Sequence, residues 1–355
     1  MAKVNSRSAP RGWPPVAWPL LLLTGTALVL ALSIILVGSN PERAFDEFVS
    51  GSMGTKAGLG GTAARGAVLL FYALGIALSF RAGIINIGAE GQSRMGAAAA
   101  VALTLGQPGA IFRAHGWIGI PVLLFVGALA GALWSLIAGV LKRWRDVPEV
   151  ISTLMLNFAA LHLVKYFVSS HDWLQGNTEF QKNELASSLQ FHGWSGTEFH
   201  SGIFLTIPAI ILAHGYLFHT TGGMHLRAMG FNRFAARACG VACEKMTLGI
   251  FAVSGALAGM AGAITVMAAG ELTADPAYSE FGYMAISVAL VALLKPLWIL
   301  PAAVLFGAME MGALSMESGA GVPHWIIYFI NGLLILAMLA RDAGTRRNLA
   351  GESGT

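Results

Sequence analysis

Long apolar runs alternate with short polar segments along almost the whole chain. If each run of about 20 apolar residues is one membrane crossing, the pattern predicts ten helices. They are expected at 17–38, 63–80, 84–105, 117–141, 149–169, 203–219, 247–270, 282–294, 298–317 and 324–340. We therefore predict an all-α, polytopic transmembrane helical bundle over residues 17–340, between an N-terminal segment 1–16 and a tail 341–355.

Composition supports the same class. Hydrophobic residues make up 55% of the chain and charged residues only 11%, whereas soluble domains carry about 25% charged residues. The mean hydropathy is +0.67. The formal net charge of +4 therefore concerns membrane topology, and we expect no binding to nucleic acid. The chain has only two cysteines, Cys239 and Cys243. Without a second pair of cysteines a zinc site is not expected, so we predict that they are packing residues.

The distribution of lysine and arginine predicts the orientation. With the N-terminus in the cytoplasm, the inside segments hold fifteen of these residues and the outside segments five. Cytoplasmic loops of membrane proteins carry such an excess, so we expect both termini to be cytoplasmic. Ten helices with this orientation can divide into two inverted repeats of five helices each.

Matching positions in these repeats point to a site near the middle of the membrane. The span 84–105 contains Gly88 and Gly91, and the matching span 282–294 is the shortest and is bounded by Gly282 and Pro296. Paired short or interrupted helices of this kind indicate a binding site at the repeat interface.

Polar residues gather at this interruption. Asn86, Glu90 and Gln92 lie inside a predicted crossing, where a carboxylate costs about 2.5 kcal/mol or more. Such a group must face protein or water. Two interpretations stay open for Glu90: a group on the substrate pathway, or a buried ion pair with Arg94 at helical i,i+4 spacing.

Two further polar residues, Glu149 and Asn157, lie in the predicted crossing 149–169. Their carboxylate and amide groups could bind the hydroxyl groups or base edges of a substrate. Asn157 has no obvious partner in the sequence, so we expect it on the pathway or as a cap on a neighbouring helix.

Each of the two long predicted loops has two possible roles, and a repeated five-residue string predicts helix packing. The polar outside loop 170–201 could contact an extracytoplasmic partner or only cover helix ends, and its histidines lack a metal-binding spacing. The inside loop 220–246 predicts a short helix from Arg233 to Lys245 with Asn232 as its N-cap. This helix could dock into another protein or merely connect two crossings. The GALAG strings at 127–131 and 255–259 predict close-packing helix faces.

The sequence lacks the motifs of a hydrolase. It has no G-x-x-x-x-G-K-[ST] loop, no G-x-S-x-G elbow and no H-E-x-x-H helix. We therefore expect no catalytic residues, no metal and no cofactor of its own. Energy would come from an ion gradient or from another subunit.

Four ordered blocks, between about residues 50 and 340, resemble the permease subunits of bacterial ABC importers for nucleosides and simple sugars, within the branched-chain amino acid permease superfamily. The blocks are Phe80–Gln92, Pro148–Asn157, Leu226–Val241 followed by Ser254–Gly262, and Gly282–Leu294 followed by Phe306–Ala308 and Gly321–Pro323. The resemblance implies a multi-pass protein of the bacterial inner membrane that translocates nucleosides or purine bases. A simple sugar or an amino acid is the alternative substrate, and an ion-coupled carrier is the alternative machine.

The resemblance also implies partners and a coupling element. The partners would be an ATPase subunit that binds ATP, a second permease chain (related or identical), a substrate-binding protein and membrane lipid. The loop at 226–241 is similar to the helix that docks into the ATPase, although Phe234 stands where the family pattern has Glu. The coupling residues would be Arg227, Asn232, Arg233, Ala235, Ala236, Arg237 and Gly240.

Overall fold

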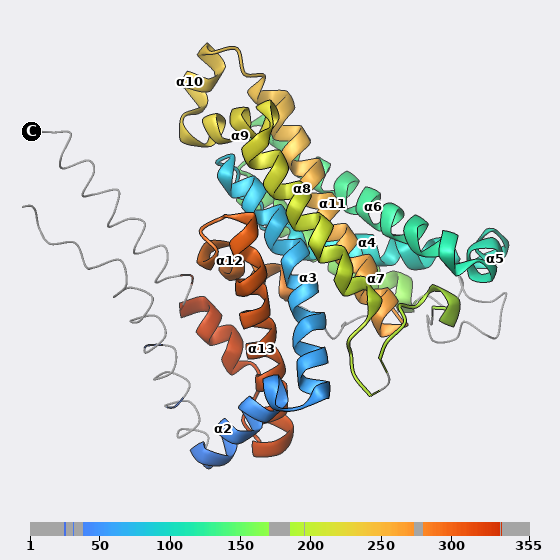
Figure 1. Ribbon diagram of the computed structural model, residues 1–355. Helices are drawn as coiled ribbons and strands as arrows, with labels where there is room; N and C mark the ends of the chain where they lie inside the picture. The colour runs from blue at the N-terminus through green and yellow to red at the C-terminus, as the bar shows by residue number, and fades with distance from the viewer. Residues whose placement is uncertain are drawn as a thin grey trace, which may run out of the picture.

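The computed structural model describes residues 38–169, 185–194, 196–272 and 280–333, with the isolated positions 25, 31 and 335. These residues form a helical bundle (Figure 1), and within the described ranges the only β-type pairing is an isolated bridge between Gly193 and His200. The segment 1–16, almost all of the predicted span 17–38, residues 170–184 of the predicted outer loop and the tail 341–355 lie outside the described residues.

The helices follow one another with short connections. They are α2 (Pro41–Val49), α3 (Lys56–Arg81), α4 (Ala89–Thr104), α5 (Gly106–Ala114), α6 (Gly116–Arg145), α7 (Glu149–Ser169), α8 (Thr206–His219), α9 (Thr221–Phe231), α10 (Arg233–Ala238), α11 (Cys243–Ala269), α12 (Phe281–Val291) and α13 (Pro296–Ala320). One turn of π-helix, η1 (Ser50–Gly54), precedes α3, and 3₁₀ turns η4 (Ser187–Leu189) and η5 (Ser201–Leu205) precede α8. Residues 326–333 are also helical.

Six helices in the described part are long and apolar enough to cross a membrane: Lys56–Arg81, Gly116–Arg145, Glu149–Val168, Ser201–His219, Cys243–Ala269 and Pro296–Ala320. Each overlaps a predicted crossing. The predicted span 84–105 differs, because residues 84–88 are not helical and α4 begins only at Ala89. The predicted span 282–294 forms the short helix α12, which ends at Val291. Only residues 324–333 of the last predicted span are described, so its full length stays a prediction.

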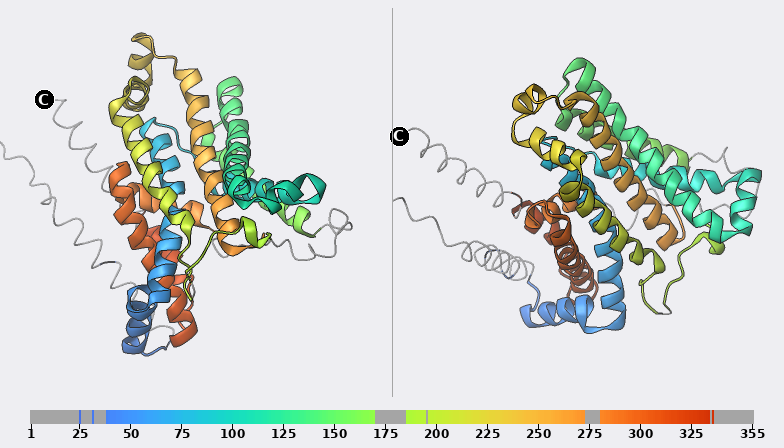
Figure 2. Two further views of the ribbon diagram at one scale, coloured as in Figure 1. Left: turned by 45° about the vertical axis from the view of Figure 1, so that its right-hand side comes forward. Right: turned by 45° about the horizontal axis from the view of Figure 1, so that its top comes forward.

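Helices α3 and α11 form the centre of the bundle. α3 contacts α11 on one side and α12 and α13 on the other, while α11 also contacts α4 and α6 (Figures 1 and 2). The apolar window of α3 is 89% buried, whereas those of α6, α7 and α8 are each 28% buried. These three outer helices therefore present apolar side chains to the surroundings, as expected of a protein in lipid.

Glycine faces allow the central helices to approach closely. A Cβ atom at Gly259 on α11 would overlap the carbonyl oxygen of Gly127 on α6 and lie 2.9 Å from the Gly131 Cα. The two GALAG strings thus pack against each other, which confirms them as close-packing faces. A Cβ at Gly307 on α13 would likewise lie 2.6 Å from the carbonyl oxygen of Thr62 on α3.

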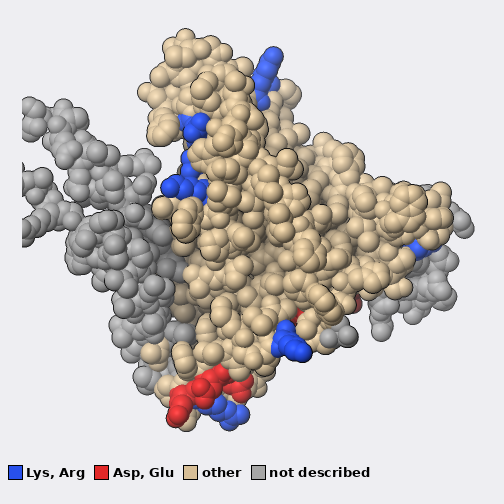
Figure 3. Space-filling model, viewed as in Figure 1, with Lys and Arg blue, Asp and Glu red and all other residues tan. Residues whose placement is uncertain are grey.

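Segments predicted to share a side of the membrane lie at the same end of the bundle. At one end, Arg81 Nε donates to the carbonyl oxygen of Leu294 (2.6 Å), and Arg143 lies 3.8 Å from Glu244. At the other end, the Ser39 hydroxyl donates to the carbonyl oxygen of Ala320 (3.0 Å). In the view of Figure 3, acidic side chains gather at the α2 end and basic side chains dominate the α9–α10 end. The charge asymmetry read from the sequence therefore follows the long axis of the bundle.

Candidate functional site

The chain leaves helical geometry between α3 and α4. The last turn of α3 closes through bonds from the Ala82 N–H to the Ser79 carbonyl (3.0 Å) and from the Ile84 N–H to the same carbonyl (3.0 Å). Gly83 has a φ of +73°, which L-residues rarely adopt. Residues 85–87 are not helical, and Gly88 is the N-cap of α4. We call residues 82–91 the α3–α4 joint.

Asn86 organises the inside of this joint. Its Oδ1 accepts from the Gly88 N–H (2.9 Å) and from Gln92 Nε2 (3.1 Å), and its Nδ2 donates to Ser254 Oγ on α11 (3.0 Å). Asn86 and Gln92 are both buried. The predicted residues Asn86 and Gln92 therefore contact each other, and they tie the joint to the central helix.

Asn157 clamps the joint from α7. Its Oδ1 accepts from the Gly91 N–H (2.8 Å), and its Nδ2 donates to the Ile87 carbonyl (2.9 Å) and the Tyr283 hydroxyl (3.1 Å). The first N–H groups of a helix have no partner inside the helix, so Asn157 caps α4 from another element. Gly91 lies inside α4 and does not interrupt it; a Cβ there would lie 2.8 Å from Asn157 Oδ1. The interruption predicted at Gly88 and Gly91 thus covers residues 84–88 and does not reach Gly91.

Glu90 joins the beginnings of two short helices. One carboxylate oxygen lies 3.1 Å from Arg94 Nη2, which is the ion pair predicted from the spacing, and the other accepts from the Gly282 N–H on α12 (2.9 Å). The N-termini of α4 and α12 therefore meet at this carboxylate, and the helices then run to opposite ends of the bundle. Because helix N-termini carry partial positive charge, a buried carboxylate is well placed between them.

Glu149 lies apart from this group. Its carboxylate is 3.3 Å from Lys142 Nζ at the end of α6. The structure therefore brings together four of the five predicted pathway residues and leaves Glu149 near the Arg81 end of the bundle.

Three polar residues near the joint, Ser254, Tyr283 and Glu310, were not predicted from the sequence as functional. Ser254 and Tyr283 contact Asn86 and Asn157, and the buried Glu310 on α13 interacts with the Tyr328 hydroxyl. The Oε2 atom of Glu310 has no hydrogen-bond partner in the described part of the chain. The signal for Glu310 was available, since it is a carboxylate inside the predicted span 298–317 and the argument used for Glu90 applies to it.

The loop predicted as a coupling element forms two short helices, which we call the α9–α10 elbow (Thr221–Ala238). Asn232 separates them and caps α10, because its Oδ1 accepts from the N–H groups of Phe234 and Ala235 (both 3.0 Å). This confirms the predicted N-cap. The helix ends at Ala238 rather than continuing to Lys245, and Gly240 has a φ of +85°.

The predicted coupling residues divide into inner and outer positions. Arg227 lies over the ring of Phe218 (5.1 Å) and Ala236 is buried, so neither presents its side chain fully to a partner. Ala235, Arg237 and Gly240 are exposed, and Arg233 is partly exposed. A Cβ at Gly240 would meet no atom within 4 Å, so this glycine serves the turn rather than close packing within the chain.

The most exposed aromatic residues of the elbow were not predicted as functional. Phe231 is 92% exposed and Phe234 is 86% exposed. The described residues contain no group of three His, Cys, Asp or Glu side chains that could hold a metal ion.

Comparison with known proteins agrees with this architecture. The family described as branched-chain amino acid transport system / permease component matches residues 58–339. The guanosine ABC transporter permease protein NupP of Bacillus subtilis (strain 168) is 31% identical over 86% of this chain and 88% of its own length. The nucleoside ABC transporter permease protein NupB of Lactococcus lactis subsp. cremoris is 26% identical over 89% of this chain and 88% of its own length.

A sugar transporter is also among the similar proteins. The glucose ABC transporter permease protein TsgB13 of Haloferax volcanii is 25% identical over 96% of this chain and 91% of its own length. No solved structure matches the chain.

Proposed function

This chain belongs to the family of permease components of branched-chain amino acid transport systems, and from that premise we propose that it carries nucleosides or purine bases into a bacterial cell as the membrane-spanning subunit of an ABC importer. It is a multi-pass membrane transport protein and not an enzyme. ATP would be bound and hydrolysed by a separate subunit, and we propose no cofactor for this chain.

The main observation that supports coupling to an ATPase is that Phe231 and Phe234 on the α9–α10 elbow are exposed. Exposed aromatic side chains are enriched where proteins bind partners. The elbow lies at the end of the bundle where the predicted inside segments gather, so we place it in the cytoplasm together with both termini. Phe231, Phe234, Ala235 and Arg237 would contact the ATPase, while Asn232, Ala236 and Gly240 would fix the shape of the elbow.

The opposite end would receive the substrate. The described part of the outer loop, residues 185–194 and 196–205, packs against the helix ends there, since the Leu185 N–H donates to the Gly270 carbonyl (2.6 Å). We propose that this end faces the substrate-binding protein. A second permease chain, identical or related, would pair with an outer apolar face of the bundle to complete the pathway.

The α3–α4 joint would form part of the pathway wall. Asn86, Glu90, Gln92 and Asn157 use their hydrogen-bonding groups within the protein, so we propose that they hold α4 and α12 in place rather than bind substrate strongly. Glu149 would lie near the cytoplasmic opening. The Glu310 Oε2 atom is buried and has no hydrogen-bond partner among the described residues, so Glu310 is a candidate for contact with a hydroxyl group of the substrate.

Nucleosides are favoured over sugars because two similar proteins that cover most of the chain, one of them 31% identical, are nucleoside or guanosine permeases. Glucose remains the second candidate on the strength of the Haloferax protein. These ABC permeases also favour an ATP-driven machine over an ion-coupled carrier.

Proteoliposomes test both parts of the proposal. The assembled complex, with ATP inside and the binding protein outside, should accumulate radiolabelled guanosine, and excess glucose should not compete. Uptake of glucose without guanosine would assign the sugar function instead.

The same preparation tests the elbow. We expect Phe234→Ser to lower ATPase association about tenfold or more, since buried aromatic anchors contribute about 2 kcal/mol or more to an interface. The control is Trp194→Ser, which removes an aromatic side chain that is 71% exposed at the opposite end. Equal association of both variants would refute docking through the elbow.

A further inference from the structure

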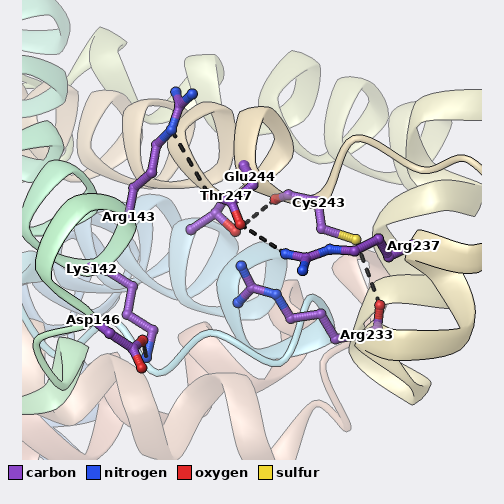
Figure 4. A network of polar contacts seen from close by, with 8 residues as sticks. All are labelled: Lys142, Arg143, Asp146, Arg233, Arg237, Cys243, Glu244 and Thr247. Atoms are coloured by element: carbon purple, nitrogen blue, oxygen red, sulfur yellow. Dashed lines mark hydrogen bonds and ion pairs between the residues drawn. The ribbon is translucent and has the colours of Figure 1, made fainter.

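A polar pocket lies between the elbow and two long helices. Its volume is about 360 Å³, and it is lined by Lys142, Arg143 and Asp146 at the end of α6, Arg233, Phe234 and Arg237 on α10, and Glu244 in the first turn of α11. Figure 4 shows Arg233 and Arg237 extending from α10 toward Glu244 and the end of α6, while Lys142 turns toward Asp146. The volume falls in the range of about 300–1,000 Å³ that is usual for ligand sites.

Positive charge in this pocket exceeds negative charge. Glu244 is shared between Arg237 (2.8 Å) and Arg143 (3.8 Å). Lys142 is paired with Asp146 (3.1 Å) and Glu149 (3.3 Å), so the excess of positive charge rests on Arg143, Arg233 and Arg237 against the single carboxylate of Glu244. The pocket is therefore suited to an anion.

Arg233 is the least satisfied of the four cations. Its guanidinium has no ion pair or hydrogen bond to any residue in the described ranges, although it lines the pocket. A guanidinium group binds phosphate oxygens through paired N–H donors. An anion held by Arg233 would also neutralise the neighbouring Arg143, whose contact with Glu244 is long.

The position of the pocket indicates where the anion comes from. It opens beside α6, a helix whose apolar window is only 28% buried and which therefore faces lipid. Trp144, next to Lys142 and Arg143, is 74% exposed, and tryptophan residues at helix ends mark the membrane interface. The pocket therefore lies at the level of lipid headgroups.

We propose that this pocket binds the phosphodiester headgroup of an anionic phospholipid through Arg233 and Arg143, and that the bound lipid fixes the α9–α10 elbow to the end of α6. Basic pockets between membrane helices on the cytoplasmic side bind such headgroups. The inference rests on the proposed function only in placing the elbow in the cytoplasm. The lipid would thereby stabilise the geometry in which the elbow meets the ATPase.

Lipid retention by the purified full chain tests the proposal without the ATPase. The chain is exchanged into detergent that contains either phosphatidylglycerol or phosphatidylcholine, and bound lipid is counted by native mass spectrometry. We expect retention of phosphatidylglycerol alone, and a loss of about tenfold or more in Arg233→Gln, since the variant removes the charge-assisted hydrogen bonds to the phosphate oxygens. Arg145→Gln is the matched control, because it removes a cation from the same end of α6 outside the pocket lining. Elution of each variant as a monodisperse peak shows that it is folded.

Three results would overturn the proposal: equal retention of both lipids, equal losses in the two variants, or displacement of the lipid by millimolar inorganic phosphate, which would identify a site for the free ion. ATPase association, measured on the same variants, separates this inference from the proposed function. If Arg233→Gln keeps phosphatidylglycerol but loses the ATPase, the lipid site is refuted and the docking role of the elbow stands.

Discussion

The packing of the two GALAG strings allows a sharp test of the fold. In Gly259→Ala, the new Cβ would overlap the Gly127 carbonyl oxygen and lie 2.9 Å from Gly131 Cα and 3.0 Å from Gly131 N. Non-bonded carbon atoms prefer separations of about 3.5–4.0 Å. All of the opposing atoms belong to the backbone, so no side-chain rotation can relieve the overlap and α6 must move away from α11.

The magnitude follows from a matched control on the same helix. Overpacking a tight contact costs about 1–3 kcal/mol, whereas replacing glycine by alanine inside a helix gains up to about 1 kcal/mol. A Cβ at Gly249, also on α11, would meet no atom within 4 Å. Gly249→Ala therefore receives the gain without the overlap, and the two variants should differ by about 1–3 kcal/mol.

Thermal unfolding in detergent measures this difference. In domains of 150–250 residues, 1 kcal/mol shifts the midpoint by about 2–4 °C, so we expect Gly259→Ala to unfold on the order of 5 °C below Gly249→Ala. Both variants should be compared at one detergent concentration and scan rate. Equal midpoints would show that α6 and α11 are not in contact at this glycine face.

Two further predictions concern the joint and the outer loop. Asn157→Ala leaves the Gly91 N–H and the Ile87 carbonyl without their partner, and each unsatisfied buried group costs about 1–3 kcal/mol. We therefore expect a lower yield of folded protein and a lower unfolding midpoint. An unchanged midpoint with lost uptake would instead place Asn157 in direct contact with substrate. Burial lowers the pKa of the His200 imidazole below its ordinary 6.5, so the folded loop binds fewer protons than the unfolded loop and its stability falls as the pH drops below about 6.5. The protection of amides in residues 185–205 against hydrogen exchange, taken relative to the intrinsic exchange rate at each pH, should therefore fall between pH 7.5 and pH 5, and His200→Phe should abolish this pH dependence.

Local spacing in the sequence predicts contacts within one helix well. The pair of Glu90 and Arg94 is a consequence of i,i+4 geometry, and Asn232 was recognised as an N-cap because its position before α10 is typical. Both contacts need only a helix to exist. The apolar runs likewise predicted the long helices, because the bilayer sets their length and composition.

Contacts between residues far apart in the sequence could not be predicted from local spacing. The partner of Asn157 on α4 lies 66 residues away, and the partner of Glu90 on α12 lies 192 residues away. The GALAG strings were recognised as packing faces, but nothing in either string states that the other is its partner. Residues 84–88 were assigned to a helix from their apolar character, whereas bonds from Asn86 and Asn157 hold them in a non-helical conformation.

The joint also explains how a break in helical geometry persists within the membrane. Backbone groups freed by a break must be satisfied by protein, since lipid offers no hydrogen bonds. Here the side chains of Asn86 and Asn157 take over the Gly88 and Gly91 N–H groups and the Ile87 carbonyl. The joint is thereby bonded to three other helices: Asn86 bonds to Ser254 on α11, Glu90 bonds to Gly282 on α12, and Asn157, which lies on α7, bonds to Gly91 of α4. A displacement of any one of these helices must therefore either carry the start of α4 with it or break a buried hydrogen bond. Because the second course costs about 1–3 kcal/mol per unsatisfied group, the joint and its partners should move as one unit when the pathway opens.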